Sequence, residues 1–446
     1  MQQDLLIKNA TVLTLGKKSA VLHAHDILIK TGRIWKIAPT GSLGVFTGTV
    51  IDAHGKIAMP GLINAHMHFY SSFARGLSRA KPSKNFNEVL KNLWWKLDGA
   101  LTLEDVYLSA MIALVDCIKK GTTTIIDHHA SPGAVRGSLN QIARAVRETG
   151  LRASLCYEVS DRDGPQVAED GILENLEFIQ ETRRQVATGD ESIRALFGLH
   201  ASFTLSDQTL SRAAAKAATL GAGFHIHAAE AKSDQDACLK EHGCRVVERF
   251  KKSGLLGDKT ILAHGVHLSD AEISILAETN TTLVHNPQSN MNNAVGAANL
   301  IKLNRAGVRV GLGTDAMTTH MFEEVRVALW LQKHLHQDPS CGFMESLGAL
   351  LFQNPEIADR YWSQQLGRLT EGGAADLILL DYIAPTPLDA QSLLGHLCFG
   401  VSHATVDTTI VGGRVLMQNK ELKLPIDEQR LCGLARERAQ KIWEVF

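Results

Sequence analysis

Two histidines separated by a single residue, His66 and His68, follow the apolar run MPGLINA. Side chains alternate between the two faces of a β-strand, so both imidazoles point the same way if this run is a strand. Imidazole nitrogens are common ligands of zinc and of other divalent transition metals. The spacing therefore predicts that His66 and His68 bind one metal ion at the end of a strand.

Three later apolar runs lead into residues of matching chemistry, namely His227 with Glu230, then His264, then Asp315. We predict that His227 and Asp315 complete the set of metal ligands. Three imidazoles and one carboxylate leave a coordination position open for water, whose pKa the metal lowers toward ~7. Asp315 would accept a proton from that water while it binds the metal, and Glu230 would pass a proton to the leaving group. His264 would polarise the substrate, orient the water or bind the metal itself.

Five further residues are candidates for contact with a substrate. His200 ends the fourth apolar run of the central region. Two-metal barrels of this general type commonly need a bridging lysine, and this strand end offers none, which favours a single metal ion. His129 and Asn286 end the second and seventh runs. Trp95 and Asp98 lie in the long connection 69–103, which we predict to be a lid over the site rather than a plug on the surface.

The central region alternates between apolar runs that end in a polar residue and amphipathic helical patterns. Ser269 and Glu272 have the spacing of a capping box at the start of one helix. Eight strands that alternate with helices predict an α/β protein with a parallel (β/α)8 TIM barrel, whose chemistry lies at the carboxyl ends of the strands. The predicted strands are 61–68, 122–129, 152–158, 194–200, 223–227, 260–264, 281–286 and 308–315, and the clearest helices are 104–120, 139–149, 207–220 and 270–278.

Both ends of the chain are different from the middle, because they consist of short β-branched runs separated by Gly, Asn and Asp turn residues. We therefore predict two domains. Residues 1–57 and 367–446 would form one composite β-sandwich domain, and residues 58–366 would form the barrel.

Composition limits the classes of partner. The 446 residues carry a formal net charge of −1, which argues against a nucleic-acid-binding surface, and no apolar run reaches the length of a membrane span. The seven cysteines show no CxxC pair, and the first residues lack the pattern of a signal peptide. These features predict a cytoplasmic protein that acts on a small molecule.

The motifs resemble those of the amidohydrolase superfamily, in particular its mononuclear, cytosine-deaminase-like branch of aminohydrolases and chlorohydrolases. Within it the chain is similar to SsnA-type aminohydrolases, a group associated with purine catabolism. The resemblance implies a barrel beside a composite β-sandwich, one divalent ion per chain, and a homo-oligomer, dimeric or larger. Zinc is the first candidate for the ion and iron the second. The matching segments are MPGLINAHMH, the HxxE of His227 to Glu230, LAHGVHL, HNPQSNM, GLGTDA and GRLTEGGAADLILLD.

The same resemblance assigns roles to individual residues. It makes His66, His68, His227 and Asp315 the metal ligands, Glu230 and His264 the acid–base groups, and His200 a substrate contact. Two positions depart from the family pattern. Ala316 stands where many relatives have glycine. Asp98 stands where several adenosine-type deaminases have glutamate, and its shorter side chain argues against a nucleoside substrate that carries ribose.

The leading hypothesis is a metal-dependent aminohydrolase that deaminates a small N-heterocycle, such as a purine, a pyrimidine or a related amidine, and releases ammonia. One alternative is a hydrolase with another leaving group, such as chloride or an amide nitrogen. A second alternative is a catalytically inactive barrel with a structural role.

Overall fold

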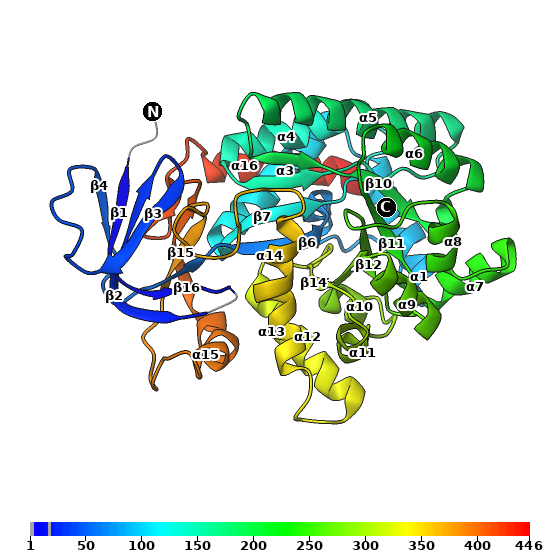
Figure 1. Cartoon of the computed structure of the whole chain (residues 1–446). Helices are drawn as coiled ribbons and strands as arrows, with labels where there is room; N and C mark the ends of the chain where they lie inside the picture. Colours follow the sequence, from blue (N-terminus) through cyan, green and yellow to red (C-terminus); the bar gives the residue numbers. More distant parts are fainter. Residues whose placement is uncertain (1–3, 17–18) are drawn as a thin grey trace.

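The computed structural model describes residues 4–16 and 19–446. Figure 1 shows a barrel surrounded by helices, with a separate sheet beside it that carries the N-terminal strands. The strands of the barrel are short, buried and parallel to their neighbours. They are β6 (Leu62–Met67), β7 (Thr122–Asp127), β8 (Arg152–Leu155), β10 (Phe197–Ala201), β11 (Phe224–Ala228), β12 (Ile261–His264), β13 (Thr282–His285) and β14 (Val310–Leu312). A short ninth strand, β9 (Ile193–Ala195), pairs with β8 just before β10 begins.

Two isolated bridges join these strands into a ring. Val159, just after β8, pairs with Leu199 of β10, and Met67 of β6 pairs with Asp315 just after β14. Both bridges are parallel, like the ladders between the other neighbours. The strand order therefore confirms the predicted barrel, and the carboxyl ends of its strands meet at one mouth.

Helices follow the strands and cover the outside of the barrel. The predicted capping box at Ser269 and Glu272 is present at the start of α9, and Thr102 with Asp105 forms another at the start of α3. The helices in this part of the chain are α3 (Leu103–Lys120), α4 (Ser138–Thr149), α5 (Pro165–Ala187), α6 (Asp207–Thr219), α7 (Lys232–His242), α8 (Val246–Lys252), α9 (Asp270–Glu278), α10 (Pro287–Asn292), α11 (Leu300–Arg305), α12 (Met321–His336), α13 (Phe343–Gly348) and α14 (Asn354–Ala358), with a π-helical turn at Ala349–Gln353.

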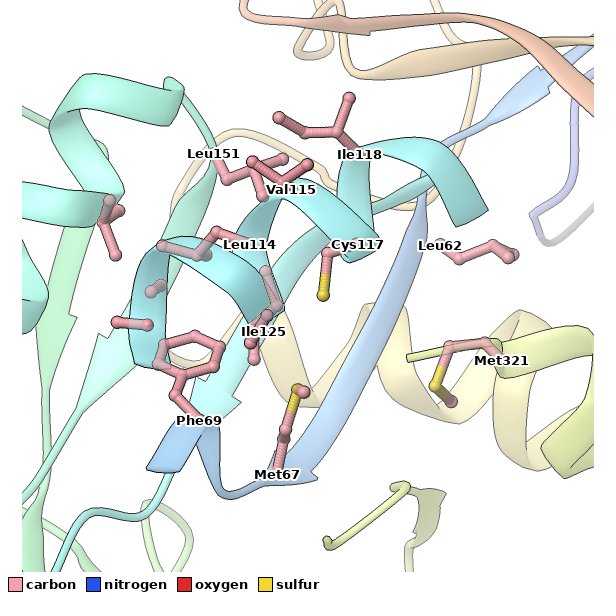
Figure 2. Close-up of a cluster of buried hydrophobic side chains, with 14 of the residues drawn as sticks. Leu62, Met67, Phe69, Leu114, Val115, Cys117, Ile118, Ile125, Leu151 and Met321 are labelled. Atoms are coloured by element: carbon pink, nitrogen blue, oxygen red, sulfur yellow. The ribbon is translucent and has the colours of Figure 1, made fainter. Parts of the chain in front are cut away.

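Burial of apolar side chains holds the helices to the strands. Figure 2 shows Leu114, Cys117 and Ile118 of α3 in one cluster with Leu62 and Ile125 from β6 and β7. Burying a leucine or isoleucine side chain contributes about 1.5–3 kcal/mol. The packing of α3 against these two strands fixes the β6 end from which His66 and His68 project.

The second sheet contains strands from both ends of the chain. Strand β5 (Ile57–Pro60) pairs with β15 (Leu377–Asp381), so N-terminal and C-terminal segments lie side by side. The remaining strands are β1 (Leu5–Leu13), β2 (Val21–Lys30), β3 (Arg33–Pro39), β4 (Thr49–Asp52), β16 (Thr405–Val411), β17 (Arg414–Gln418) and β18 (Glu421–Leu422). The composite β-domain is therefore confirmed as an architecture, whereas the division at residues 57/58 and 366/367 stays a prediction.

Two helices lie in the C-terminal part, α15 (Leu393–Phe399) and α16 (Glu428–Ile442). Helix α16 packs on α3 of the barrel, and Arg438 of α16 hydrogen-bonds Asp105 of α3 at 2.6 and 2.8 Å. No helix among the described residues is long and apolar enough to cross a membrane.

The long connection after β6 is mostly helical. It contains a 3-10 helix at Phe69–Ala74, α1 (Phe86–Val89), a π-helical turn at Leu90–Trp94 and α2 (Trp95–Gly99). Side chains of this segment line the cavity at the barrel mouth, which gives the segment the position that a lid would have.

Candidate active site

The four predicted metal ligands come together at the mouth of the barrel. His66 and His68 project from the end of β6, His227 from β11, and Asp315 from the turn after β14. The Nε2 atoms of His68 and His227 are 3.2 Å apart, and Asp315 Oδ1 lies 3.0 Å from His68 Nε2 and 3.4 Å from His66 Nε2. All four side chains are buried, and one ligand atom from each lies within 4.8 Å of the others.

Backbone carbonyls set the tautomers of two of these histidines. His227 Nδ1 lies 3.0 Å from the carbonyl oxygen of His200, and His68 Nδ1 hydrogen-bonds the carbonyl oxygen of His128. A carbonyl oxygen only accepts hydrogen bonds, so each Nδ1 carries the hydrogen. The neutral rings of His68 and His227 therefore present lone pairs on Nε2 to the centre of the site.

A side-chain relay does the same for His66. Its Nδ1 atom lies 2.9 Å from His225 Nε2, and His225 Nδ1 lies 3.8 Å from Cys156 Sγ. The Cys156 thiol donates to the carbonyl oxygen of Asp127, so its sulfur accepts from His225 and His225 Nε2 accepts from His66. The buried Nε2 atom of His66 is then a lone pair without a hydrogen-bond partner among the described residues.

Three imidazole lone pairs and one carboxylate oxygen thus converge without a hydrogen between them. This is the donor set of a divalent metal ion such as zinc, so the residues fit the predicted cofactor. Burial lowers the pKa of His66 to about 3 and holds that of His227 well below its usual range, so these two rings stay neutral and keep their lone pairs. Asp315 acts in the other direction on His68, whose pKa it raises to about 9 against the effect of burial, so a proton and a metal ion compete for its Nε2 atom.

Glu230 and His264 lie beside Asp315. Glu230 Oε2 is 3.5 Å from His264 Nε2, and His264 Nδ1 lies 2.9 Å from Asn290 Oδ1. The other carboxylate oxygen of Glu230 accepts a 3.2 Å hydrogen bond from Asn293 Nδ2. Burial raises the pKa of Glu230 to about 7, with His264 opposing the shift, so this carboxyl group can both hold and release a proton near neutral pH.

Three residues at the barrel mouth, beside the proposed metal ligands and acid–base groups, have positive φ angles. Ala229, His264 and Asp315 have φ values of 51°, 76° and 51°, in the left-handed region that non-glycine residues seldom adopt. Such conformations cost about 1–3 kcal/mol each and persist where the surroundings impose them. Here they turn the chain sharply just after β11, within the last residue of β12 and just after β14, next to the predicted catalytic side chains.

The segment after β13 supplies partners that inspection of single residues missed. The Ser289 hydroxyl donates to Asp315 Oδ2, while Asn290 and Asn293 contact His264 and Glu230. All three belong to α10 or its C-terminal end; Ser289 and Asn290 lie within the motif HNPQSNM, and Asn293 follows two residues after it. The motif was the available signal, but its spacing alone does not show which polar groups face the metal site.

A cavity opens above the metal-ligand group. Three of the five predicted substrate contacts line it, namely His200, Trp95 and Asp98. The other two are buried outside its lining. His129 Nε2 lies 2.9 Å from Ser131 Oγ, and the Asn286 amide donates to the carbonyl oxygen of Val284 in the preceding strand, β13.

One wall of the cavity holds an ion pair that the sequence did not indicate. The Arg162 guanidinium binds Asp98 Oδ2 and also hydrogen-bonds Asp163 at 2.7 Å, while its central carbon lies 5.3 Å from the centre of the Trp95 ring. Burial raises the pKa of Asp98 to about 7 against the opposing effect of Arg162. Asp98 Oδ1 and Trp95 Nε1 are both buried and have no hydrogen-bond partner among the described residues, so each can serve a bound molecule.

Glu158 is the second residue of the wall that was not predicted. It ends the third predicted strand, so the polar residue at a strand end was the available signal. Its carboxylate lies 3.2 Å from His128 Nδ1 and 3.5 Å from His200 Nε2. Burial alone would raise the pKa of Glu158, but His200 and His128 hold it well below its usual range.

Comparisons with known proteins decide the family. The model of the amidohydrolase family matches residues 57–416. The chain belongs to the amidohydrolase family. Two curated relatives are a 5-methylthioadenosine/S-adenosylhomocysteine deaminase of Desulforudis audaxviator, 33% identical over 99% of both chains, and a 5'-deoxyadenosine deaminase of Methanosarcina mazei, 31% identical over 98% of both chains.

Solved structures support the fold of this amidohydrolase. A zinc-bound adenosine deaminase from Xanthomonas campestris superposes with a TM-score of 0.87 over 98% of both chains, at 24% identity. The zinc complex of atrazine chlorohydrolase TrzN from Arthrobacter aurescens superposes with a TM-score of 0.81 over 98% of this chain and 100% of that chain, at 21% identity. The predicted family, the predicted fold and the prediction of a hydrolase acting on C–N bonds are therefore confirmed.

Proposed function

We propose that this amidohydrolase removes the amino group of an aminopurine or a closely related N-heterocycle by hydrolysis of the C–N bond and releases it as ammonia. The observation that carries the proposal is the convergence of three imidazole lone pairs on Asp315, with Glu230 and His264 beside it. The deaminases among the curated relatives support the reaction, and their names support an adenine-type ring.

The mechanism follows from the positions of the side chains. A divalent ion held by His66, His68, His227 and Asp315 would supply an activated water and polarise the C–N carbon. Asp315, whose Oδ2 is held by Ser289, can accept a proton from the attacking water. Glu230, whose Oε2 atom lies 3.5 Å from His264 Nε2, can carry a proton near neutral pH and give it to the departing nitrogen.

The protons and bonds balance across this sequence. Water supplies the oxygen of the new carbonyl group, and the C–N bond to the amino group breaks. One hydrogen of the water ends on the leaving nitrogen as ammonia and the other on the neighbouring ring nitrogen. His264, positioned by Asn290, steadies the adduct beside Glu230.

We further infer the finer properties of the protein from the sequence and its relatives. Zinc is the proposed ion, with iron second, because three imidazoles with a carboxylate accept either. Purine catabolism is the proposed setting, and the cytoplasm the proposed compartment. A homo-oligomer, dimeric or larger, is the proposed assembly, and 1–57 with 367–446 and 58–366 are the proposed domains. His200, Trp95 and Asp98 are the proposed substrate contacts on the cavity wall.

The test is ammonia release by protein of known metal content. The panel contains adenine, adenosine, 5'-deoxyadenosine, 5-methylthioadenosine, S-adenosylhomocysteine, guanine, cytosine, pterins and triazines. We expect ammonia from purines and its loss in Asp315→Asn. Asp236→Asn, which alters an exposed aspartate paired with Lys232, is the matched control and should keep full activity.

Two outcomes would overturn the proposal. Chloride release from a chlorotriazine, without ammonia from any ring, would indicate the other leaving group. Absence of bound metal, even after reloading with zinc or ferrous iron, would indicate an inactive barrel.

A further inference from the structure

Glu158 is a buried carboxylate that the proposed mechanism does not use. It follows β8, is 5% exposed and lines the cavity beside His200. Arg162 pairs with Asp98 and Asp163, so no arginine or lysine of the described residues forms an ion pair with Glu158. A buried carboxylate without such a partner is costly and calls for other hydrogen bonds.

The groups that face the Glu158 carboxylate do not fill its capacity to accept hydrogen bonds. Its oxygens face one nitrogen of His128 and one of His200. The other ring nitrogens of these residues already have partners, because His128 Nε2 donates to the carbonyl oxygen of His225 and His200 Nδ1 lies 2.6 Å from Thr204 Oγ1. The Thr204 hydroxyl gives its own hydrogen to a carbonyl, so it accepts from His200. An ionised carboxylate accepts about four hydrogen bonds, and two imidazoles supply two at most.

The position of Glu158 relative to the metal ligands is also specific. Glu230 groups with His264 and Asp315, whereas Glu158 groups with His68 and His227, each set of ligand atoms lying within 4.8 Å. The two carboxylates therefore flank the metal-ligand group from different strands. A ring that presents its amino group to Glu230 can place another edge against Glu158.

We propose that Glu158 is a specificity-determining residue that accepts a hydrogen bond from a second N–H or amino donor on the substrate ring. This inference rests on the proposed function and names the substrate class more closely. The preferred ring is of the guanidine type, with an amino donor in addition to the amino group that is removed. A ring with a lone pair or an anionic group at that edge is disfavoured, because it meets a carboxylate.

The experiment compares two purines that differ by one amino group, adenine and 2,6-diaminopurine. We expect the wild-type protein to prefer 2,6-diaminopurine. Glu158→Gln should lower kcat/KM for 2,6-diaminopurine by roughly 10- to 100-fold, mainly through KM, because the charged acceptor is replaced by a neutral amide that also carries a competing N–H donor group. The same variant should change kcat/KM for adenine by less than about threefold, and Glu158→Met, which removes the acceptor altogether, should show the larger effect.

Two controls separate recognition from structure. Metal content and the unfolding temperature should stay unchanged in Glu158→Gln. Glu174→Gln replaces another buried glutamate, whose carboxylate accepts from the backbone of Gly137 and Leu139, and should leave the ratio between the two purines unchanged.

An equal loss of kcat/KM for both purines in Glu158→Gln, or a loss of bound metal, would overturn the inference. Glu158 would then only hold His128 and His200 in position. If the wild-type protein releases no ammonia from either purine, the proposed function fails. The dissociation constants of the two rings, measured by calorimetry with wild type and Glu158→Gln, then still decide whether Glu158 reads the second amino group.

Discussion

Replacing His225 tests the relay behind the metal-ligand group. His225 lies entirely within the barrel, and its Nε2 atom is the only partner of His66 Nδ1 among the described residues. His225→Leu leaves that N–H without an acceptor whenever His66 Nε2 binds a metal ion. A buried donor without a partner costs about 1–3 kcal/mol, which corresponds to metal binding weaker by roughly 5- to 150-fold. Loss of the outer partner of a metal-binding histidine costs about 10- to 100-fold in other proteins, so the two magnitudes overlap.

The assay is competition with a chelator of known affinity, followed by measurement of the metal that stays with the protein. His225→Gln offers an amide oxygen as a replacement acceptor and should recover part of the loss. His334→Leu, at an exposed position on α12, is the control and should bind metal as the wild type does. Unchanged affinity in His225→Leu would refute the argument that His225 sets the tautomer of His66.

Three further predictions follow from contacts at and around the site. Ser289→Ala removes the hydroxyl that holds Asp315 Oδ2 and should lower kcat about tenfold with metal content unchanged, as steady-state kinetics with metal analysis would show. Arg162→Leu leaves Asp98 buried without its partner and should destabilise the protein by about 3–5 kcal/mol in denaturant unfolding, whereas the double variant with Asp98→Leu should recover much of this. Asp105→Asn should cost about 2 kcal/mol at neutral pH, because it weakens a capping box and a partly exposed contact with α16. Burial raises the pKa of Asp105, but the hydrogen bonds from Arg438 and Thr102 lower the pKa below its usual value. The contribution of Asp105 to stability is therefore present above the unfolded pKa of about 3.9 and is lost as the pH falls through the folded pKa. The difference in stability between the variant and the wild type should disappear in acid.

The strands and the convergence of the four proposed metal ligands were predictable because their signals are local. A strand of the barrel shows as an apolar run, and the alternation of side chains places His66 and His68 on one face. The ends of such strands meet by topology, so His227 and Asp315 could be assigned to the same mouth without knowledge of any contact.

The alternation of side chains no longer predicts where a side chain points once the strand has ended, so the predicted substrate contacts beyond the strand ends are less accurate. β7 ends at Asp127, and the chain beyond it turns the His129 side chain to Ser131 rather than to the cavity. Asn286 lies between β13 and α10, where its amide folds back to the strand. The pairing of Arg162 with Asp98 joins helix α2 to the loop before α5, 64 residues further along the chain, and no pattern in either segment specifies the other.

The bridge between Met67 and Asp315 ties the order of folding to the metal site. The amide nitrogen of Asp315 donates to the carbonyl oxygen of His66 at 3.0 Å, and that of His68 donates to the carbonyl oxygen of Asp315 at 3.3 Å. The first and last strands of the barrel therefore join through the ligand residues themselves. A chain that has been synthesised only as far as α11 contains His66, His68 and His227 but lacks Asp315 and the strand that closes the ring. The full set of four ligands exists only when the ring is closed. The free energy of metal binding therefore stabilises the closed barrel against separation of β6 from the turn after β14.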